Sequence, residues 1–562
     1  MAVEQSGWFS KELTGRMLLF IALFHGMHVA LFAVGWWKQI TDQRLAGLNT
    51  LTFSVWISRG AGLALSVDGM IIVLPMCKNL LRIIRPKVRW LPLDESQWFH
   101  RQVAYSILFF TTIHVSAHYV NFFNVERNQV RPESAVQIHY TQAGGITGHV
   151  MLLCMLFMFT TAHVRIRQQC YEAFWYTHHL FIPFLLAFYT HATGCFVRDS
   201  TEPYSPFAGS PFWSHCIGYE GWRWELIGGG LYLCERLYRE WDSRRACRIE
   251  RVIRHPYDAL EIQFSKPSMT YKPGQWILVN VPEVSTTQWH PFTITSCPFD
   301  SYTSIHVRQV GDWTRALGDA VGAGPTQVSE CGLDADGMYE IALMPNQEMP
   351  AIRVNGPYGA PAEDVFENEI AVLIGTGIGV TPWASNLKNI FNHRSRPNAP
   401  LRLKRVEFIW ICRDTKSFEW FQMLLSSLEE QSQEAASESG AGPEFLRIHT
   451  YLTQKLDADE QANVHLNTVG MDKDPLTNLS ARTNFGRPDF KKLFAAMKDG
   501  IRDSTYLGGA LEETTGKEKA SRKKAEVGVY FCGPNTAAKQ IRSACKGVTD
   551  SDVRFKFWKE HF

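Results

Sequence analysis

The chain has 562 residues, and its 57 Lys and Arg residues nearly balance 55 Asp and Glu residues, which leaves a formal net charge of +2. This balance gives no reason to expect a nucleic acid or another polyanion as a partner. None of the 12 Cys residues forms a Cys-x-x-Cys pair, which excludes a disulfide scaffold, a zinc ribbon and a thioredoxin-type motif. Aromatic residues make up 13% of the chain, yet the mean hydropathy is only −0.15. A membrane part joined to a soluble part explains that combination.

The first part of the chain contains six apolar stretches close to the length of about 20 residues that a membrane-spanning helix needs. The last is the weakest, because charged residues at both of its ends leave a short apolar centre. A cleaved signal peptide is not expected, because the first apolar stretch is too long for one. The expected spans are 17–37, 53–77, 98–123, 146–164, 173–197 and 222–238.

Lys and Arg residues in the connecting segments predict the orientation of these spans. They concentrate in the N-terminal segment, in loops 78–97 and 165–172, and in 236–251, all on one side of the membrane. The loops on the other side contain fewer. We therefore expect both termini on the cytosolic side of an integral membrane protein. The host membrane, either the plasma membrane or an endomembrane such as the ER or vacuole, stays open.

Beyond about residue 247 the sequence has the pattern of a soluble α/β protein. Strands are expected at 252–264, 276–281 and 304–310, with Gly- and Pro-rich stretches between them, as in a small β-barrel. After the break at 355–359, apolar strands alternate with helical segments, which is typical of a doubly wound sheet. These later strands are expected at 369–374, 406–411 and 527–531.

We expect three domains with boundaries at 1–245, 246–360 and 361–562. The Ser- and Glu-rich segment 429–442 and the Lys-rich segment 511–526 are predicted to be unstructured. Each is either a solvated insertion or a regulatory, phosphorylated loop.

Histidines within the third and fifth expected spans are the strongest functional signal, because an imidazole inside a bilayer is costly. His100 and His114 lie 14 residues apart, which places them about 40° apart around a helix and about 21 Å apart along its axis. His178 and His191 are 13 residues apart, and an ideal helix would leave them about 140° out of phase. Pro183 lies between them and is expected to supply a distortion.

The third and fifth spans run in the same direction across the membrane. His100 and His178 are therefore expected near the inner face, and His114 and His191 near the outer face. Each pair can supply the two axial ligands of one haem, so the four histidines predict two stacked haems.

Other ionisable residues in the spans have less specific interpretations. His149 and His163 form a rival pair in the fourth span, where interfacial roles are favoured over metal ligation. Arg59 and His118 are expected at the depth of the outer haem. There a cation can hold a haem propionate or stabilise an oxygen anion, although Arg59 can equally extend to the membrane interface. Asp68 has no partner that the sequence identifies.

The four histidines, together with the run Phe-Trp-Tyr-Thr-His-His-Leu at 174–180, resemble the membrane domain of the NADPH oxidase catalytic subunits. Ferric reductases share this wider architecture. The resemblance implies two b-type haems in two layers, with Arg59 and His118 as the catalytic residues that border the oxygen-reducing site. The implied haem ligands are His100, His178, His114 and His191.

The run His-Pro-Phe-Thr at 290–293 resembles the flavin-binding motif of the ferredoxin–NADP reductase superfamily. This implies a Thr293 hydroxyl near the flavin N5, and segments 306–308 and 311–314 match the part that holds the FAD pyrophosphate. The family's terminal aromatic ring, which shields the flavin, corresponds to Phe562. The implied FAD-binding residues are His290, Pro291, Thr293, Arg308, Trp313, Thr314 and Phe562.

The glycine-rich segment 375–382 follows an apolar strand and precedes an expected helix. Glycines there allow a pyrophosphate to approach the helix N-terminus, although a tight strand–helix turn alone can also require them. The segment and the later runs at 410–413, 486–488 and 531–534 resemble the nucleotide site of the reductases. Two implied contacts of arginines with a 2′-phosphate favour NADPH over NADH. The implied NADPH-binding residues are Gly375, Gly377, Gly379, Thr381, Pro382, Cys412, Arg413, Arg487, Cys532 and Gly533.

The resulting expectation is a six-helix transmembrane di-haem bundle followed by an FAD-binding β-barrel and an NADPH-binding α/β domain. Electrons would pass from cytosolic NADPH through FAD and two haems to O2, giving superoxide on the far side. A ferric or cupric chelate reductase with the same path is one alternative. A non-enzymatic di-haem scaffold is another.

The sequence pattern 334–337 lacks the remaining ligands of an EF-hand, so activation by partners is expected instead of calcium control. The resemblance, which is nearest to the fungal branch, implies a small membrane subunit (p22-like), a cytosolic activator (p67-like) and a Rac-type GTPase. Cys195 and Cys216 are expected on the oxidising side, either as a disulfide or as two free thiols.

Overall fold

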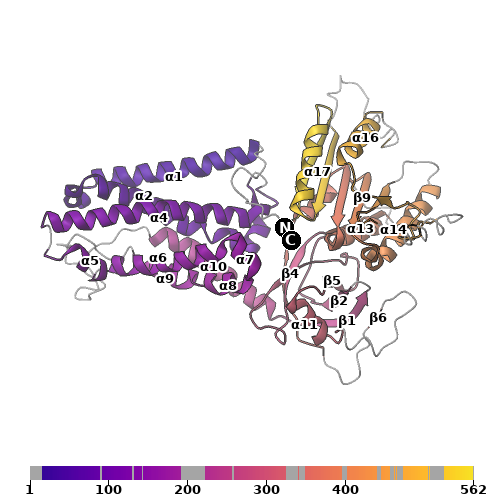
Figure 1. The fold of residues 1–562 in the computed structure, drawn as a ribbon, viewed down its shortest axis with the longest axis horizontal. Coiled ribbons are helices and arrows are strands. Elements are labelled where there is room, and N and C mark those ends of the chain that lie inside the picture. The colour runs from indigo at the N-terminus through magenta and orange to yellow at the C-terminus, as the bar shows by residue number, and fades with distance from the viewer. Residues whose placement is uncertain are drawn as a thin grey trace. The chain divides into compact units, whose positions relative to one another are not determined.

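The chain folds into two compact units, Met1–Tyr238 and Arg239–Phe562 (Figure 1). The expectations for Phe562, for the Cys195 and Cys216 pair and for 511–524 lie outside the described residues. The computed structural model describes residues 15–88, 91–129, 132–141, 143–191, 222–255, 258–324, 339–340, 349–394, 402–438, 445–455, 461, 464, 473–503, 506 and 525–560.

The first unit is helical, and α1, α2 and α4 run alongside one another in it (Figure 1). Among its described residues, four helical stretches are long and apolar enough to cross a membrane, and they correspond to the first four expected spans. Its longer helices are α1 (Gly15–Thr41), α2 (Phe53–Ile71), α4 (Ser96–Arg127), α6 (Ala143–Ala162) and α10 (Trp222–Ser243). Shorter helices are α3 (Lys78–Ile84), α5 (Ala135–Thr141) and α7 (Val164–Gln169).

The expected fifth span is not one continuous helix. It consists of α8 (Tyr171–His178) and α9 (Phe181–His191), with a turn between them. Pro183 has no N–H to donate to the carbonyl of His179, four residues earlier. The N–H of Ile182 instead donates to that carbonyl at 3.0 Å, a tighter turn than an α-helix makes. The proline therefore accounts for a break, where the sequence suggested only a distortion.

The barrel of the second unit consists of two antiparallel sheets. Their inward-facing apolar side chains share one core with Trp313 and Leu317 of α11 (Asp312–Ala320). In order across the sheet, the first contains β5 (Thr303–Arg308), β2 (Ala259–Ser265), β1 (Arg248–His255) and β6 (Tyr339–Glu340). The second contains β4 (His290–Thr293), β3 (Trp276–Asn280) and β7 (Arg353–Tyr358).

A six-stranded parallel sheet follows the barrel. Alternate residues of a strand face opposite sides of a sheet, and on β8 Leu373 packs into one apolar core while Val372 packs into another. Helices α13 (Thr381–Arg394) and α14 (Glu419–Glu438) cover the first face, and α16 (Phe490–Arg502) and α17 (Asn535–Val548) cover the second. The strand order is β11 (Asn484–Phe485), β10 (Leu446–Leu452), β9 (Arg405–Cys412), β8 (Ile370–Thr376), β12 (Ala525–Cys532) and β13 (Val553–Lys559).

The prediction that 429–442 is unstructured was wrong for residues 429–438, which continue helix α14. Buried Leu428 fixes one face of this helix in the core. The carboxylate of Glu429 accepts the backbone N–H groups of Ser480 and Ala481 at 2.6 and 3.1 Å. The acidic composition that suggested a solvated loop therefore anchors the helix to a neighbouring segment. Residues 525 and 526 likewise belong to strand β12.

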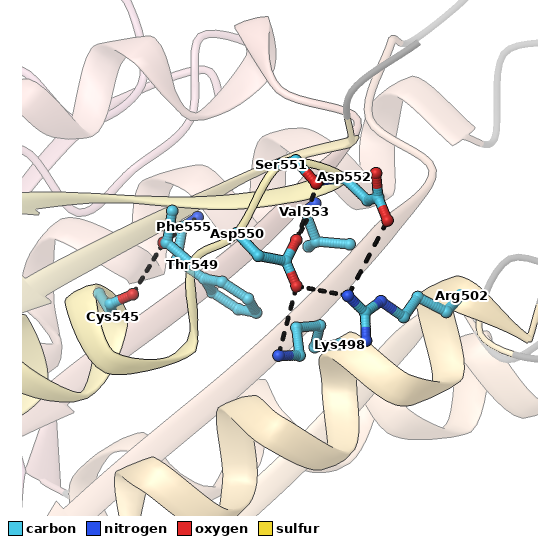
Figure 2. A network of polar contacts seen from close by, with 9 residues as sticks. All are labelled: Lys498, Arg502, Cys545, Thr549, Asp550, Ser551, Asp552, Val553 and Phe555. Atoms are coloured by element: carbon cyan, nitrogen blue, oxygen red, sulfur yellow. Dashed lines mark hydrogen bonds and ion pairs between the residues drawn. The ribbon is translucent and has the colours of Figure 1, made fainter. Parts of the chain in front are cut away.

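A turn between α17 and β13 is organised by the carboxylate of Asp550 (Figure 2). This carboxylate accepts the backbone N–H groups of Asp552 and Val553, both at 2.9 Å. It also pairs with Lys498 and Arg502 of α16, at 3.4 and 2.5 Å. The backbone hydrogen bonds lower the pKa of Asp550 from its usual 3.8 to about 2. Its stabilising effect is therefore complete above pH 3.8 and is lost as the pH falls through about 2.

Replacing Asp550 with Ala should loosen this turn without unfolding the sheet, because the carboxylate is solvent-accessible and its loss leaves no buried group unpaired. Hydrogen exchange measured by mass spectrometry should show faster exchange in residues 549–553 and unchanged exchange in β8. Asp552→Ala is the matched control, since that side chain lies 3.9 Å from Arg502 and accepts neither backbone N–H. Equal exchange in both variants would contradict the assignment.

Candidate functional site

Two pairs of histidines face one another inside the helical unit. The rings of His100 on α4 and His178 on α8 have centroids 6.1 Å apart, and those of His114 on α4 and His191 on α9 are also 6.1 Å apart. A bond from a metal ion to an imidazole nitrogen is about 2.0–2.1 Å long, so two rings on opposite sides of one ion have centroids roughly 6 Å apart. Each pair therefore has the separation that one bis-histidyl metal ion requires.

The break between α8 and α9 explains how His178 and His191 can face the same neighbouring helix. A single helix would turn His178 and His191 away from each other. Because α8 ends at His178 and a turn precedes α9, each short helix presents its histidine to α4 independently.

Backbone carbonyls of the α2 segment orient both histidines of α4. The Nδ1 atom of His100 lies 2.8 Å from the carbonyl oxygen of Ile72, and that of His114 lies 2.9 Å from the carbonyl oxygen of Ser58. A ring N–H donated to a carbonyl leaves the other nitrogen, Nε2, able to bind a metal and makes it a stronger electron donor. The two acceptors lie 14 residues apart, as the two histidines do on the neighbouring helix.

The histidines of the fifth span differ in how they are held. The Nδ1 atom of His191 lies 3.0 Å from the hydroxyl oxygen of Thr147 on α6. The Nδ1 atom of His178 is buried and has no hydrogen-bond partner among the described residues. Sequence reasoning missed Thr147 because a threonine in an apolar helix gives no signal of its own.

Glycines line the pair His114 and His191, where a flat cofactor needs room. A Cβ atom placed on Gly62 would lie 3.3 Å from the His114 ring, and one placed on Gly148 would lie 3.4 Å from the His191 ring. Larger side chains at these positions would press on the imidazoles. Paired rings, anchored Nδ1 atoms and small neighbours together fit a haem, which supplies reversible one-electron chemistry when bound.

The two expected catalytic residues lie beside the pair His114 and His191. The ring of His118 is 4.5 Å from that of His114, one helical turn away on α4. Arg59 directly follows Ser58, whose carbonyl orients His114, and its charge acts on both His114 and His191. The structure thus brings a cation and an additional imidazole next to the pair.

Other polar residues of the spans have partners of their own. Asp68 does have a partner, since its carboxylate lies 2.7 Å from Nε2 of His28, and both side chains are buried. The carboxylate links α2 to α1. His149 contacts the hydroxyl of Tyr119 at 3.1 Å, whereas His163 accepts a backbone N–H at the start of α7. The rival pair His149 and His163 is therefore engaged in separate local contacts.

In the barrel, the expected flavin residues come from β4, β5 and α11. The ring of His290 stacks on that of Trp313, with centroids 4.0 Å apart and an interplanar angle of 25°. Thr293 ends β4 and is buried, Pro291 is exposed, and Arg308 ends β5. Thr314 has a structural task, because its hydroxyl oxygen accepts the N–H of Gly311 at 3.0 Å at the start of α11.

The expected nucleotide residues lie along one edge of the parallel sheet, at the carboxyl ends of its strands. In open α/β sheets, ligands bind outside these ends. Thr381 and Pro382 begin α13, where a proline in the first turn is well tolerated. Gly375 is the next-to-last residue of β8, Cys412 ends β9 and Arg413 follows it. Arg487 lies just after β11, and Cys532 ends β12 with Gly533 directly after it.

Two glycines allow the loops after β8 and β12 to touch. A Cβ atom on Gly379 would lie 2.7 Å from the carbonyl oxygen of Cys532, and one on Gly533 would collide with the end of β8. Gly377 has a φ of +53° and no described atom within 4 Å of its Cβ position. Its backbone is therefore open to a ligand, as a phosphate-binding loop requires.

The two cysteines at this edge are thiols, not thiolates. Burial raises the pKa of Cys532 above its usual range. Burial, with the charge of Asp414, raises the pKa of Cys412 well above it. The ionised form of a cysteine is the reactive nucleophile, so neither of these buried thiols is activated for nucleophilic attack.

Models of known families match the chain in three consecutive parts. The one described as "Ferric reductase like transmembrane component" matches residues 61–189. The one described as "FAD-binding domain" matches 245–362, and "Ferric reductase NAD binding domain" matches 368–546. The fold and the site therefore define a membrane reductase in which a ferric-reductase-like helical domain precedes flavin-binding and nucleotide-binding domains.

Relatives identify the family. The chain is 32% identical to NADPH oxidase 1 of Rattus norvegicus, over 97% of this chain and 98% of that protein. It is 33% identical to NADPH oxidase 3 of Homo sapiens, over 90% and 91%. It is 30% identical to a superoxide-generating NADPH oxidase heavy chain of Dictyostelium discoideum, over 98% and 97%. The chain belongs to the NADPH oxidase family, and it is an integral membrane enzyme that oxidises NADPH and reduces O2 to superoxide.

Proposed function

We propose that electrons leave NADPH in the cytosol, pass through FAD and two b-type haems, and reduce O2 on the opposite side of the membrane. The ligands of the inner haem are His100 and His178, and those of the outer haem are His114 and His191. The observation that carries this proposal is the equal 6.1 Å separation of the two facing imidazole pairs. When bound, FAD accepts a hydride and passes on single electrons, which haem iron carries one at a time.

The chain's own residues position these groups. The carbonyl oxygens of Ile72 and Ser58 hold the α4 imidazoles, and Thr147 holds His191. Next to the outer pair, Arg59 supplies a positive charge that favours a developing oxygen anion. His118 is the second group of this catalytic site, because its ring lies against that of His114.

In the barrel, the stacked His290 and Trp313 form a flat wall for the flavin, with Thr293 offering its hydroxyl. Arg308 neutralises the FAD pyrophosphate. At the sheet edge, the glycine loop accepts the NADPH pyrophosphate, and Arg413 and Arg487 bind its 2′-phosphate. Both arginines are exposed and follow strands that are separated only by β10.

We further propose cytosolic termini and domains at 1–245, 246–360 and 361–562. The concentration of Lys and Arg in the loops of one side supports this orientation. The activators proposed are a small membrane subunit (p22-like), a cytosolic activator (p67-like) and a Rac-type GTPase.

His178→Ala should lower the haem content of the solubilised full-length protein from two per chain to one, because it removes an axial ligand of one haem only. His179→Ala is the matched control, because the Nδ1 atom of His179 lies 2.7 Å from the carbonyl oxygen of Trp175. This variant should keep two haems per chain. The pyridine haemochrome assay measures haem, and FAD content confirms that each variant has folded. Two haems in His178→Ala, or one in His179→Ala, would refute the ligand assignment.

Thr147→Val keeps the side-chain shape but removes the oxygen that faces His191. A hydrogen bond that Nδ1–H donates to this oxygen makes the imidazole a stronger electron donor and so stabilises the ferric haem. Its loss should therefore raise the midpoint potential of one haem. The shift should be up to about 60 mV, the one-electron equivalent of roughly 1.5 kcal/mol for one hydrogen bond. Spectroelectrochemical titration measures both potentials. Thr161→Val, at the other end of α6, contacts Thr177 instead and should shift neither potential.

Replacing Arg487 with Ala should raise the KM for NADPH roughly 10- to 100-fold, because each hydrogen bond to a charged group contributes about 1.5–3 kcal/mol. The KM for NADH should change little, since NADH has no 2′-phosphate. Steady-state oxidation of both nucleotides measures the difference. Arg447→Ala is a suitable control, because this exposed arginine lies at the amino-terminal end of β10. An equal loss for NADPH and NADH would contradict the role of Arg487.

A further inference from the structure

A cluster of three potential metal ligands lies on the first sheet of the barrel, on the face that points away from the barrel core, and takes no part in the electron path. Its members are His255, Glu261 and His306, and one donor atom of each lies within 4.8 Å of the other two. The side chains of Glu261 and His306 are only 10% and 9% exposed, and that of His255 is 10% exposed.

The cluster follows from the register of three neighbouring strands. Glu261 lies on the central strand β2 and pairs directly with His306 on β5. On the other side, Ile253 of β1 pairs with Glu261. His255 lies two residues beyond Ile253 and so shares its face of the sheet. Two imidazoles on flanking strands therefore converge on one carboxylate.

The distances within the cluster fit a single ion. The carboxylate oxygen Oε2 of Glu261 lies 3.3 Å from Nε2 of His255 and 3.7 Å from Nε2 of His306. Donor atoms on a tetrahedral zinc ion, with bonds of about 2.0–2.1 Å, lie roughly 3.3–3.4 Å from one another. Small side-chain adjustments would complete such a site.

Neighbouring polar groups hold two of the ligands in place. The amide of Gln263 donates to the second carboxylate oxygen of Glu261 at 3.0 Å. The hydroxyl oxygen of Thr295 lies 2.8 Å from Nδ1 of His306, which leaves Nε2 directed at the carboxylate. Outer contacts of this kind orient the ligands in metal sites. The Nδ1 atom of His255 is buried without a hydrogen-bond partner among the described residues, so neighbouring polar groups fix this ring less firmly than that of His306.

We propose that His255, Glu261 and His306 bind one Zn2+ ion, with water in the fourth position. Two imidazole nitrogens and one carboxylate oxygen are a donor set that proteins use for zinc. The ion joins β1, β2 and β5 on one face of the barrel. Arg308 lies two residues beyond His306 on β5, so the ion also steadies the strand that carries the proposed contact with the FAD pyrophosphate. Only this last consequence rests on the proposed function.

Metal analysis of the full-length solubilised protein, dialysed first against Zn2+ and then against zinc-free buffer, tests the site. Plasma mass spectrometry should find one zinc per chain in the wild type and a loss of most of it in Glu261→Gln and His306→Ala. The control is His449→Ala, because His449 lies 2.6 Å from Glu407, which Arg405 already pairs with. No zinc in the wild type, or full zinc in Glu261→Gln, would overturn the proposal and leave a simple histidine–glutamate ion pair.

A second measurement uses the wild type alone, so it does not depend on how a variant folds. Flavin fluorescence reports the temperature at which FAD is released. A chelator should lower this temperature and added Zn2+ should restore it, while haem content stays constant. An unchanged release temperature would overturn the role of the ion. Haem content tests the ligand assignment independently, so failure of the zinc site and failure of the electron path are distinguishable.

Discussion

The register of α2 against α4 is the constraint on which the membrane site depends. A hydrogen bond at one ring nitrogen of an imidazole fixes the ring orientation and the tautomer, and it leaves the other nitrogen able to bind a metal. The carbonyl oxygens of Ile72 and Ser58 do this for His100 and His114. Because both acceptors are backbone atoms with the same spacing as the histidines, one helix–helix contact sets the orientation of both rings. A shift of α2 by one turn would release both at once.

The partner histidines, His178 and His191, are positioned in a different way. They lie on two short helices, α8 and α9, and a missing N–H at Pro183 separates these helices. Each half can therefore adopt the orientation that its own imidazole needs. The continuous helix α4 sets the spacing of one histidine in each pair, and the break between α8 and α9 allows the other two to turn towards them.

The sequence predicted the elements whose signals are local. Apolar length identified the first four spans, and glycine loops after strands identified the sheet edge. The missed features depend on three-dimensional neighbours. The partner of Asp68 is His28, 40 residues away on another helix, and the contact of Thr147 with His191 spans 44 residues. Composition also misled at 429–438, where the carboxylate of Glu429 accepts two backbone N–H groups of a distant segment.

The contact between His28 and Asp68 also limits how α1 can move. In the hydrocarbon part of a membrane, no water is present to replace a lost hydrogen-bond partner, so separating His28 from Asp68 would be costly. About two turns further along α1, a Cβ atom on Gly35 would lie 2.7 Å from the carbonyl oxygen of Arg59, so the backbones nearly touch. The His28–Asp68 contact and the close backbone approach at Gly35 lie on the same side of α1. Together they fix both the rotation of α1 about its axis and its position along that axis relative to α2.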